Sequence, residues 1–230
     1  MKIPLTKYGL PQVVVYPAIT AAAMAAAIGA RNLLGPWALI AVEVLLAGVL
    51  IWSLSFFRDP ERRCPCESNL LLAPADGTIT DIETIQEDDF IGEKALRIGI
   101  FLSIFSTHIN RAPCNVKVER ITYKAGRCKN ALNPESGRVN EANNVALVRT
   151  EEPTDKLIVR QISGAIARRI VCAVTEGQEL AGGERFGMIK FGSRTELYLP
   201  VRENAKCLVK VGDKVKAGLT TLVRYEQCQD

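Results

Sequence analysis

A glycine followed by a serine, Gly192-Ser193, is the pair of residues in this sequence with the most specific chemical use. It lies in the segment 188–200, whose alternation of apolar and polar residues predicts a β-strand with Ser193 on the apolar face. At this position, the glycine and serine are either a local irregularity of the strand or a functional site. Because glycine has no Cβ, the Ser193 hydroxyl can attack the preceding carbonyl carbon. The resulting ester can break by elimination, and the new first residue then hydrolyses to a pyruvoyl group, an electron sink.

The only histidine of the chain, His108, is the candidate for a general base. A lone histidine is by default structural or solvated, but His108 follows an apolar strand and has several polar neighbours. Asp76, in the motif Pro74-Ala-Asp-Gly77, can orient the histidine, although a tight turn is the simpler explanation of an Asp-Gly pair. We therefore expect Ser193, His108 and Asp76 to act as nucleophile, base and orienting group.

Several other functions are disfavoured by motifs that the sequence lacks. The segment Phe191-Gly-Ser-Arg-Thr195 has no second glycine, so it is not the G-x-S-x-G elbow of a serine hydrolase. Cys64-Pro-Cys66 has no matching second cysteine pair, so we expect no metal site. The seven cysteines, an odd number, indicate a reducing compartment. A net charge of only +4, without a basic stripe, argues against nucleic-acid binding.

Two apolar segments near the N-terminus predict a membrane anchor. Residues 9–30 carry no charge, and residues 37–57 carry only Glu43, so each is about the 20 residues that a spanning helix needs. We predict a transmembrane helical hairpin within residues 1–57; a single span with an interfacial helix, a buried helix pair and a cleavable signal peptide are the alternatives. Basic residues flank both ends of the hairpin, which places both ends and the following domain on the cytoplasmic side of the cell membrane.

The rest of the chain predicts a mainly β fold. Residues 58–67, RDPERRCPCE, are a polar linker, and residues 68–230 form the remaining domain, antiparallel-rich with minor helix. Residues 164–169 are expected to form a short helix or a bend. Besides the segment 188–200, the predicted strands are 95–105, 116–123, 144–149, 156–163, 170–175, 207–209 and 220–225.

A second class of function has one feature in its favour. Residues 209–218, VKVGDKVKAG, resemble the strand-turn-strand hairpin of biotinyl and lipoyl carriers. A membrane-anchored adaptor or carrier without catalytic activity is therefore the alternative. The turn residues are explained by geometry alone, and no modifiable lysine is identified at a hairpin tip.

Five segments in the same order along the chain resemble the motifs of phosphatidylserine decarboxylases of the short form with membrane helices. The resemblance runs from Phe56 to about Gly218. Its motifs are Phe56-Phe-Arg-Asp-Pro-Glu-Arg62, Pro74-Ala-Asp-Gly77, Thr107-His-Ile-Asn-Arg-Ala-Pro113, Gln161-Ile-Ser-Gly-Ala-Ile-Ala-Arg-Arg-Ile170 and Arg185-Phe-Gly-Met-Ile-Lys-Phe-Gly-Ser193.

The resemblance implies self-cleavage between Gly192 and Ser193. The products would be a β chain of residues 1–192 and an α chain of residues 193–230 that begins with a pyruvoyl group made from Ser193, and the two would stay together as a heterodimer. Asp76 and a histidine would activate the serine. The pyruvoyl group would then form a Schiff base with phosphatidylserine, and loss of CO2 would give phosphatidylethanolamine. Dimers of this unit are a further family expectation.

The chain also departs from the family pattern. Some members have a second histidine where this chain has Arg111, so either His108 serves both self-cleavage and decarboxylation or another group or water performs one of them. Recognition of the lipid phosphate calls for cations, for which Arg111, Arg168 and Lys190, together with Arg169, are candidates. Ordinary surface charge is the alternative explanation for each of them.

Overall fold

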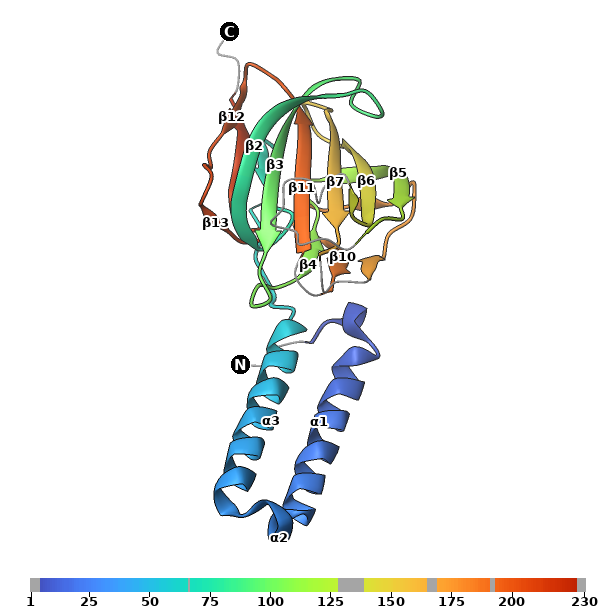
Figure 1. The fold of residues 1–230 in the computed structure, drawn as a ribbon. Coiled ribbons are helices and arrows are strands. Elements are labelled where there is room, and N and C mark those ends of the chain that lie inside the picture. The colour runs from blue at the N-terminus through green and yellow to red at the C-terminus, as the bar shows by residue number, and fades with distance from the viewer. Residues whose placement is uncertain (1–4, 66, 128–138, 165–168, 191–192, 227–230) are drawn as a thin grey trace. The chain divides into compact units, whose positions relative to one another are not determined.

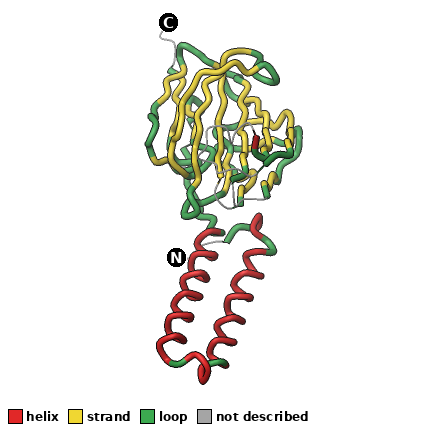
Figure 2. Tube along the Cα trace, viewed as in Figure 1, coloured by secondary structure: helices red, strands yellow, loops and turns green. Residues whose placement is uncertain are grey.

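The computed structural model describes residues 5–65, 67–127, 139–164, 169–190 and 193–226. Two compact units make up the chain, Met1–Glu61 and Arg62–Asp230. The first is helical and the second consists of β-strands (Figures 1 and 2). Gly192 and Arg168, two residues of the predicted site, lie outside the described residues, as does most of the segment 164–169.

Two long helices form the N-terminal unit. A 3-10 turn, η1 (Lys7–Gly9), precedes α1 (Gln12–Gly29); a short helix, α2 (Arg31–Leu34), connects α1 to α3 (Pro36–Phe56). Helices α1 and α3 pack side by side, and the Thr6 N–H donates to the Phe57 carbonyl (2.9 Å) near their open end. Both are long and apolar enough to cross a membrane. The structure therefore confirms the two predicted helices, and their composition indicates membrane association.

Fourteen strands are present in the described part of the second unit. They are β1 (Leu70–Leu72), β2 (Gly77–Glu87), β3 (Glu93–Leu102), β4 (Ile109–Arg111), β5 (Val116–Lys124), β6 (Ala142–Arg149), β7 (Lys156–Ile162), β8 (Ile170–Cys172), β9 (Glu179–Leu180), β10 (Arg185–Ile189), β11 (Ser193–Pro200), β12 (Ala205–Cys207), β13 (Lys214–Val215) and β14 (Thr221–Tyr225).

These strands form one large sheet and two small ones. The eight-stranded sheet has the order β13-β2-β3-β11-β7-β6-β5-β9, and the three-stranded sheets have the orders β4-β10-β8 and β1-β14-β12. All the strand pairs within them are antiparallel. The large sheet is strongly curled in Figure 1. The prediction of a mainly antiparallel β fold is therefore confirmed.

All three sheets contribute to one apolar core. Alternating residues of the large sheet, such as Ile98 and Ile100 on β3 and Leu197 on β11, pack with Phe186 of β10 and Val223 of β14. Each of these side chains is fully buried. At about 25 cal/mol per Å2, apolar burial of this kind is the main favourable contribution to folding. The core therefore fixes the small sheets against one face of the large sheet.

The prediction of a single strand over residues 188–200 is wrong. Its first part belongs to β10, which pairs with β4 and β8, and its second part is β11, which pairs with β3 and β7. Alternation alone could not reveal the division, because it describes the two faces of a strand and not the identity of its neighbours. Ser193 thus begins a strand of a different sheet from the one that Ile189 ends.

Two further sequence interpretations need correction. Gly77 begins the long strand β2, which was not predicted, so the Asp-Gly pair is not a hairpin tip; a bulge between Ile79 and Asp81 disturbs the alternation that would have indicated this strand. The carrier-like hairpin within residues 209–218 does not form either. Strand β13 pairs with β2, whereas the preceding strand β12 pairs with β14.

Candidate active site

Ser193 is the first residue of β11, the strand at the centre of the large sheet. It pairs with Leu102 of β3 and is completely buried. Within the described part of the chain, its Oγ is buried without a hydrogen-bond partner. A buried hydroxyl without a partner costs free energy. A role as a nucleophile is one explanation for keeping such a group.

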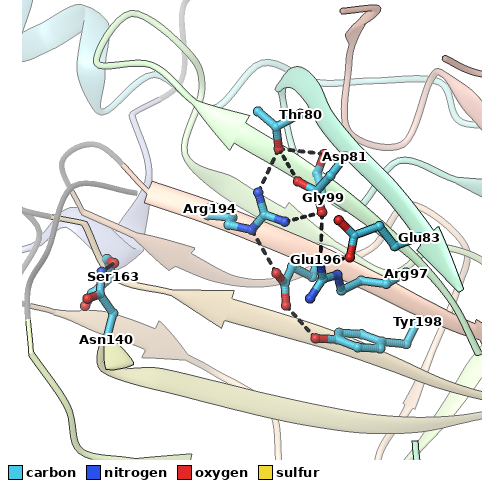
Figure 3. A network of polar contacts seen from close by, with 10 residues as sticks. All are labelled: Thr80, Asp81, Glu83, Arg97, Gly99, Asn140, Ser163, Arg194, Glu196 and Tyr198. Carbon is cyan, nitrogen blue, oxygen red and sulfur yellow. Dashed lines mark hydrogen bonds and ion pairs between the residues drawn. The ribbon is translucent and has the colours of Figure 1, made fainter. Parts of the chain in front are cut away.

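Ser163 follows β7 directly, and β7 is the neighbour of β11 in the large sheet. The pair of Ile162 with Arg194 is the last one of the register at this end, and Ser163 and Ser193 are the next residues beyond it. The Ser163 main chain is held on both sides: its N–H donates to Glu141 O (2.9 Å), and its carbonyl accepts from Asn140 Nδ2 (2.7 Å; Figure 3). Its Oγ, like that of Ser193, is buried with no partner among the described residues. Ser163 lies inside the fourth of the five motifs, but no local pattern of the sequence indicated a role for it.

A buried amide network joins the small sheet of β4 to the large sheet. Asn110 Nδ2 donates to Thr195 Oγ1 (3.0 Å), and Asn110 Oδ1 accepts from Gln161 Nε2 (2.9 Å). Gln161 Oε1 in turn accepts from Asn143 Nδ2 (3.0 Å). All four side chains are at most 3% exposed. The network fixes β4 against β11, β7 and β6, and residues two apart in an extended chain share a face.

His108 immediately precedes β4, two residues before Asn110 of the network. It is fully buried, and its carbonyl accepts from the Ile189 N–H (3.2 Å) of β10. The Nδ1 atom lies 2.9 Å from the Ser106 carbonyl oxygen. A carbonyl only accepts hydrogen bonds, so Nδ1 carries the proton. In the neutral ring, Nε2 then holds the lone pair that a general base needs.

Asp76 is held by Arg62, at the beginning of the β unit. Arg62 Nη1 and Nη2 donate to the two carboxylate oxygens (2.6 and 2.7 Å), and the Ala217 N–H donates to Oδ1 (2.7 Å). Arg62 Nη1 also donates to the Ala217 carbonyl (2.6 Å). The structure thus orients His108 through a carbonyl and binds Asp76 to an arginine. Arg62 was missed as a site residue, although it closes the first of the five motifs.

The predicted phosphate-binding cations have different surroundings. Arg111 is buried and its Nη1 donates to the Gly183 carbonyl (2.9 Å). Lys190 is also buried; burial and the nearby charge of Arg169 both lower the pKa of its ammonium group. In the described residues, no group of three or more histidine, cysteine or acidic side chains could hold a metal ion. Lys190 and Arg169 are thus two neighbouring cations, which an anionic group between them would stabilise.

Comparison with known proteins gives a consistent result. The family model described as phosphatidylserine decarboxylase matches residues 49–223. The chain is 43% identical over 191 residues to a phosphatidylserine decarboxylase proenzyme of Rhodopirellula baltica, with 83% of this chain and 78% of the relative covered. It is 43% identical over 171 residues to the proenzyme of Desulfotalea psychrophila (74% and 78% covered) and 41% identical over 191 residues to that of Symbiobacterium thermophilum (83% and 86% covered).

Proposed function

Because the chain belongs to the phosphatidylserine decarboxylase family, we propose that it converts phosphatidylserine to phosphatidylethanolamine and CO2 after cleaving itself before Ser193. The observation that carries this proposal is the buried Ser193 hydroxyl without a partner among the described residues, at the first position of β11. The adaptor or carrier alternative has no support, because its hairpin does not form and the relatives are decarboxylase proenzymes.

Self-cleavage would begin with attack of Ser193 Oγ on the carbonyl carbon of residue 192. The C–N peptide bond breaks as an ester C–O bond forms, and loss of the Ser193 Cα proton then expels the carboxylate of residue 192. The α chain that remains adds water and releases ammonia, which leaves a pyruvoyl group. We assign Nε2 of His108 as the base for self-cleavage. Asp76, held by Arg62, is assigned to keeping the adjoining loops in place.

The pyruvoyl group supplies the electron sink for loss of CO2. His108 is the residue that we assign to returning a proton to the product. Lys190, with Arg169 beside it, is assigned to the anionic headgroup, because two neighbouring cations attract an anion such as a phosphate. The assignments of Arg111 and Arg168 rest on the sequence alone.

The topology supports a stable complex of the two chains after cleavage. Residues 193–230 contain β11, which lies between β3 and β7, and β14, which lies between β1 and β12. Main-chain hydrogen bonds thus join the α chain to residues 1–192 in two sheets. We propose residues 1–57 as the membrane anchor, 58–67 as a linker and 68–230 as the catalytic domain, on the cytoplasmic side.

Intact-mass analysis of the purified full-length protein tests this proposal. We expect two chains, of residues 1–192 and 193–230, with a pyruvoyl group on the second, and release of CO2 from phosphatidylserine in mixed micelles. Ser193→Ala should remain one chain of about 25.2 kDa without activity. Ser68→Ala, at an exposed serine, is the control and should be cleaved normally. A single uncleaved chain that is active would refute the proposal.

A further inference from the structure

A cluster of buried charges lies on the face of β11 opposite Ser193, beginning with the next residue. The Arg194 guanidinium donates from Nε to Glu196 Oε1 (2.8 Å), from Nη1 to Thr80 Oγ1 (2.7 Å) and from Nη2 to Asp81 Oδ1 (2.7 Å; Figure 3). Its side chain is only 8% exposed. All three nitrogens of the guanidinium thus have an acceptor, which fixes its position.

The arrangement of three neighbouring strands allows Arg194 to reach Asp81. β3 lies between β11 and β2, and Gly99 of β3 pairs with both Glu196 and Asp81. A Cβ atom at Gly99 would lie 2.1 Å from Arg194 Nη2, so only glycine leaves room for the arginine to cross the strand. The bulge between Ile79 and Asp81 presents Thr80 and Asp81 together. Arg194 therefore reaches over one strand to bind the next.

The charges in the cluster stabilise one another. Burial opposes ionisation of Asp81, but the hydrogen bonds from Arg194 and Thr80 and the charges of Arg194 and Arg97 outweigh it and lower the pKa of its carboxyl group. Tyr198 donates its hydroxyl to Glu196 Oε2. Buried ion pairs often add little net stability compared with apolar residues of the same size. Net stability alone therefore does not account for this cluster, which begins one residue after the proposed cleavage site.

We propose that Arg194 anchors the new end of the α chain and so positions the group derived from Ser193; this inference rests on the proposed function. Cleavage removes the covalent bond to residue 192, and conversion to a pyruvoyl group removes the N–H of residue 193. Chain ends fray unless they are held. Thr80 and Asp81 remain in the β chain, so the bonds from Arg194 hold the α chain one residue from its reactive end.

The test compares Arg194→Met in cleaved protein and in the uncleavable Ser193→Ala background. Hydrogen exchange of the peptide covering residues 193–200 reports how well the start of β11 is held. In cleaved protein, we expect Arg194→Met to increase this exchange at least tenfold and to lower kcat about tenfold per pyruvoyl group, with a smaller effect on KM. In the Ser193→Ala background, the intact chain holds the strand, and exchange should change less than twofold.

The control is Arg202→Met, which removes an arginine bound to Glu93 and Asp155 beyond the other end of β11. Its effect on exchange should be the same with and without cleavage. If Arg194→Met changes the hydrogen exchange equally in the two backgrounds, the cluster is merely structural and the proposal is overturned. No change in either background would overturn it as well. If Arg194→Met does not fold or is not cleaved, Thr80→Val, which keeps every charge, is measured in the same way. A wild-type protein that is active without being cleaved would instead refute the proposed function.

Discussion

The two faces of β11 differ in how their polar groups are satisfied. On one face, Ser193 has a buried hydroxyl without a partner in the described structure, and the Ser163 hydroxyl, next after β7, is buried in the same condition. On the other face, Arg194 and Glu196 are engaged in a dense set of ion pairs and hydrogen bonds. One face is thus left available for a reaction, while the other holds the strand in place. A reactive group at the end of a strand works efficiently only when the strand holds it in the geometry that the reaction needs.

Loss of the imidazole should produce the largest effect on the reactive face. We expect His108→Ala to lower decarboxylation by about 10^2- to 10^4-fold per cleaved chain, because general acid-base catalysis contributes this much. Mass spectrometry gives the cleaved fraction and CO2 release gives the turnover. Ser106→Ala is the control, since it keeps the carbonyl that orients Nδ1. Normal turnover in cleaved His108→Ala protein would remove His108 from the decarboxylation step.

Removing the Ser163 hydroxyl, next to the pair of Ile162 with Arg194, should separate reactivity from stability near Ser193. Because Ser163 Oγ has no partner among the described residues, Ser163→Ala should change the free energy of unfolding by less than about 1 kcal/mol. We expect self-cleavage to slow about tenfold, since a hydroxyl at this position can donate to the developing oxyanion. Pulse-chase gels measure the rate. Unchanged cleavage would show that Ser163 only fills space.

A methyl group at Gly99 should disrupt the opposite face. Gly99→Ala forces Arg194 or Asp81 to move, and overpacking of this kind costs about 1–3 kcal/mol of unfolding free energy. Urea unfolding measures the loss. Gly182→Ala is the matched control, since its nearest contact would be an ordinary 3.4 Å. Equal unfolding midpoints for the two variants would mean that the charged cluster adjusts freely.

Acid should weaken the charged face, with the smallest of the four effects. The folded-state pKa of Asp81 is lowered, so its contribution to stability is complete above the unfolded pKa of about 3.9 and disappears as the pH falls through the folded value. The difference in unfolding midpoint between wild type and Asp81→Asn should therefore be constant from about pH 6 to 5 and shrink below about pH 4. A difference that grows on acidification would contradict this sign.

Local patterns in the sequence were sufficient for part of the structure. The two apolar stretches predicted both long helices, and alternation placed Ser193 on a buried face, where it lies. The same pattern merged β10 and β11 into one strand, because alternation does not specify partners. It also missed β2, where the bulge before Asp81 interrupts the period.

The arrangement of the candidate site depended on contacts between distant residues. Asn110 and Thr195 are 85 positions apart, and Arg194 lies 113 positions from Asp81, so no local spacing could have indicated either bond. A glycine inside a strand weakens it, and the reason for Gly99 is found only in the arginine that crosses the strand there.

By itself, the sequence determined the apolar segments, the faces of the strands and the residues available for chemistry, since these depend on side-chain type and a period of two or 3.6 residues. The division of the segment 188–200 between two sheets, and the bond from Arg194 to Asp81, depend on tertiary contacts that no local pattern contains. Strand pairing and buried hydrogen bonds join residues far apart in the chain, and the choice among alternative partners follows from the burial of one shared core.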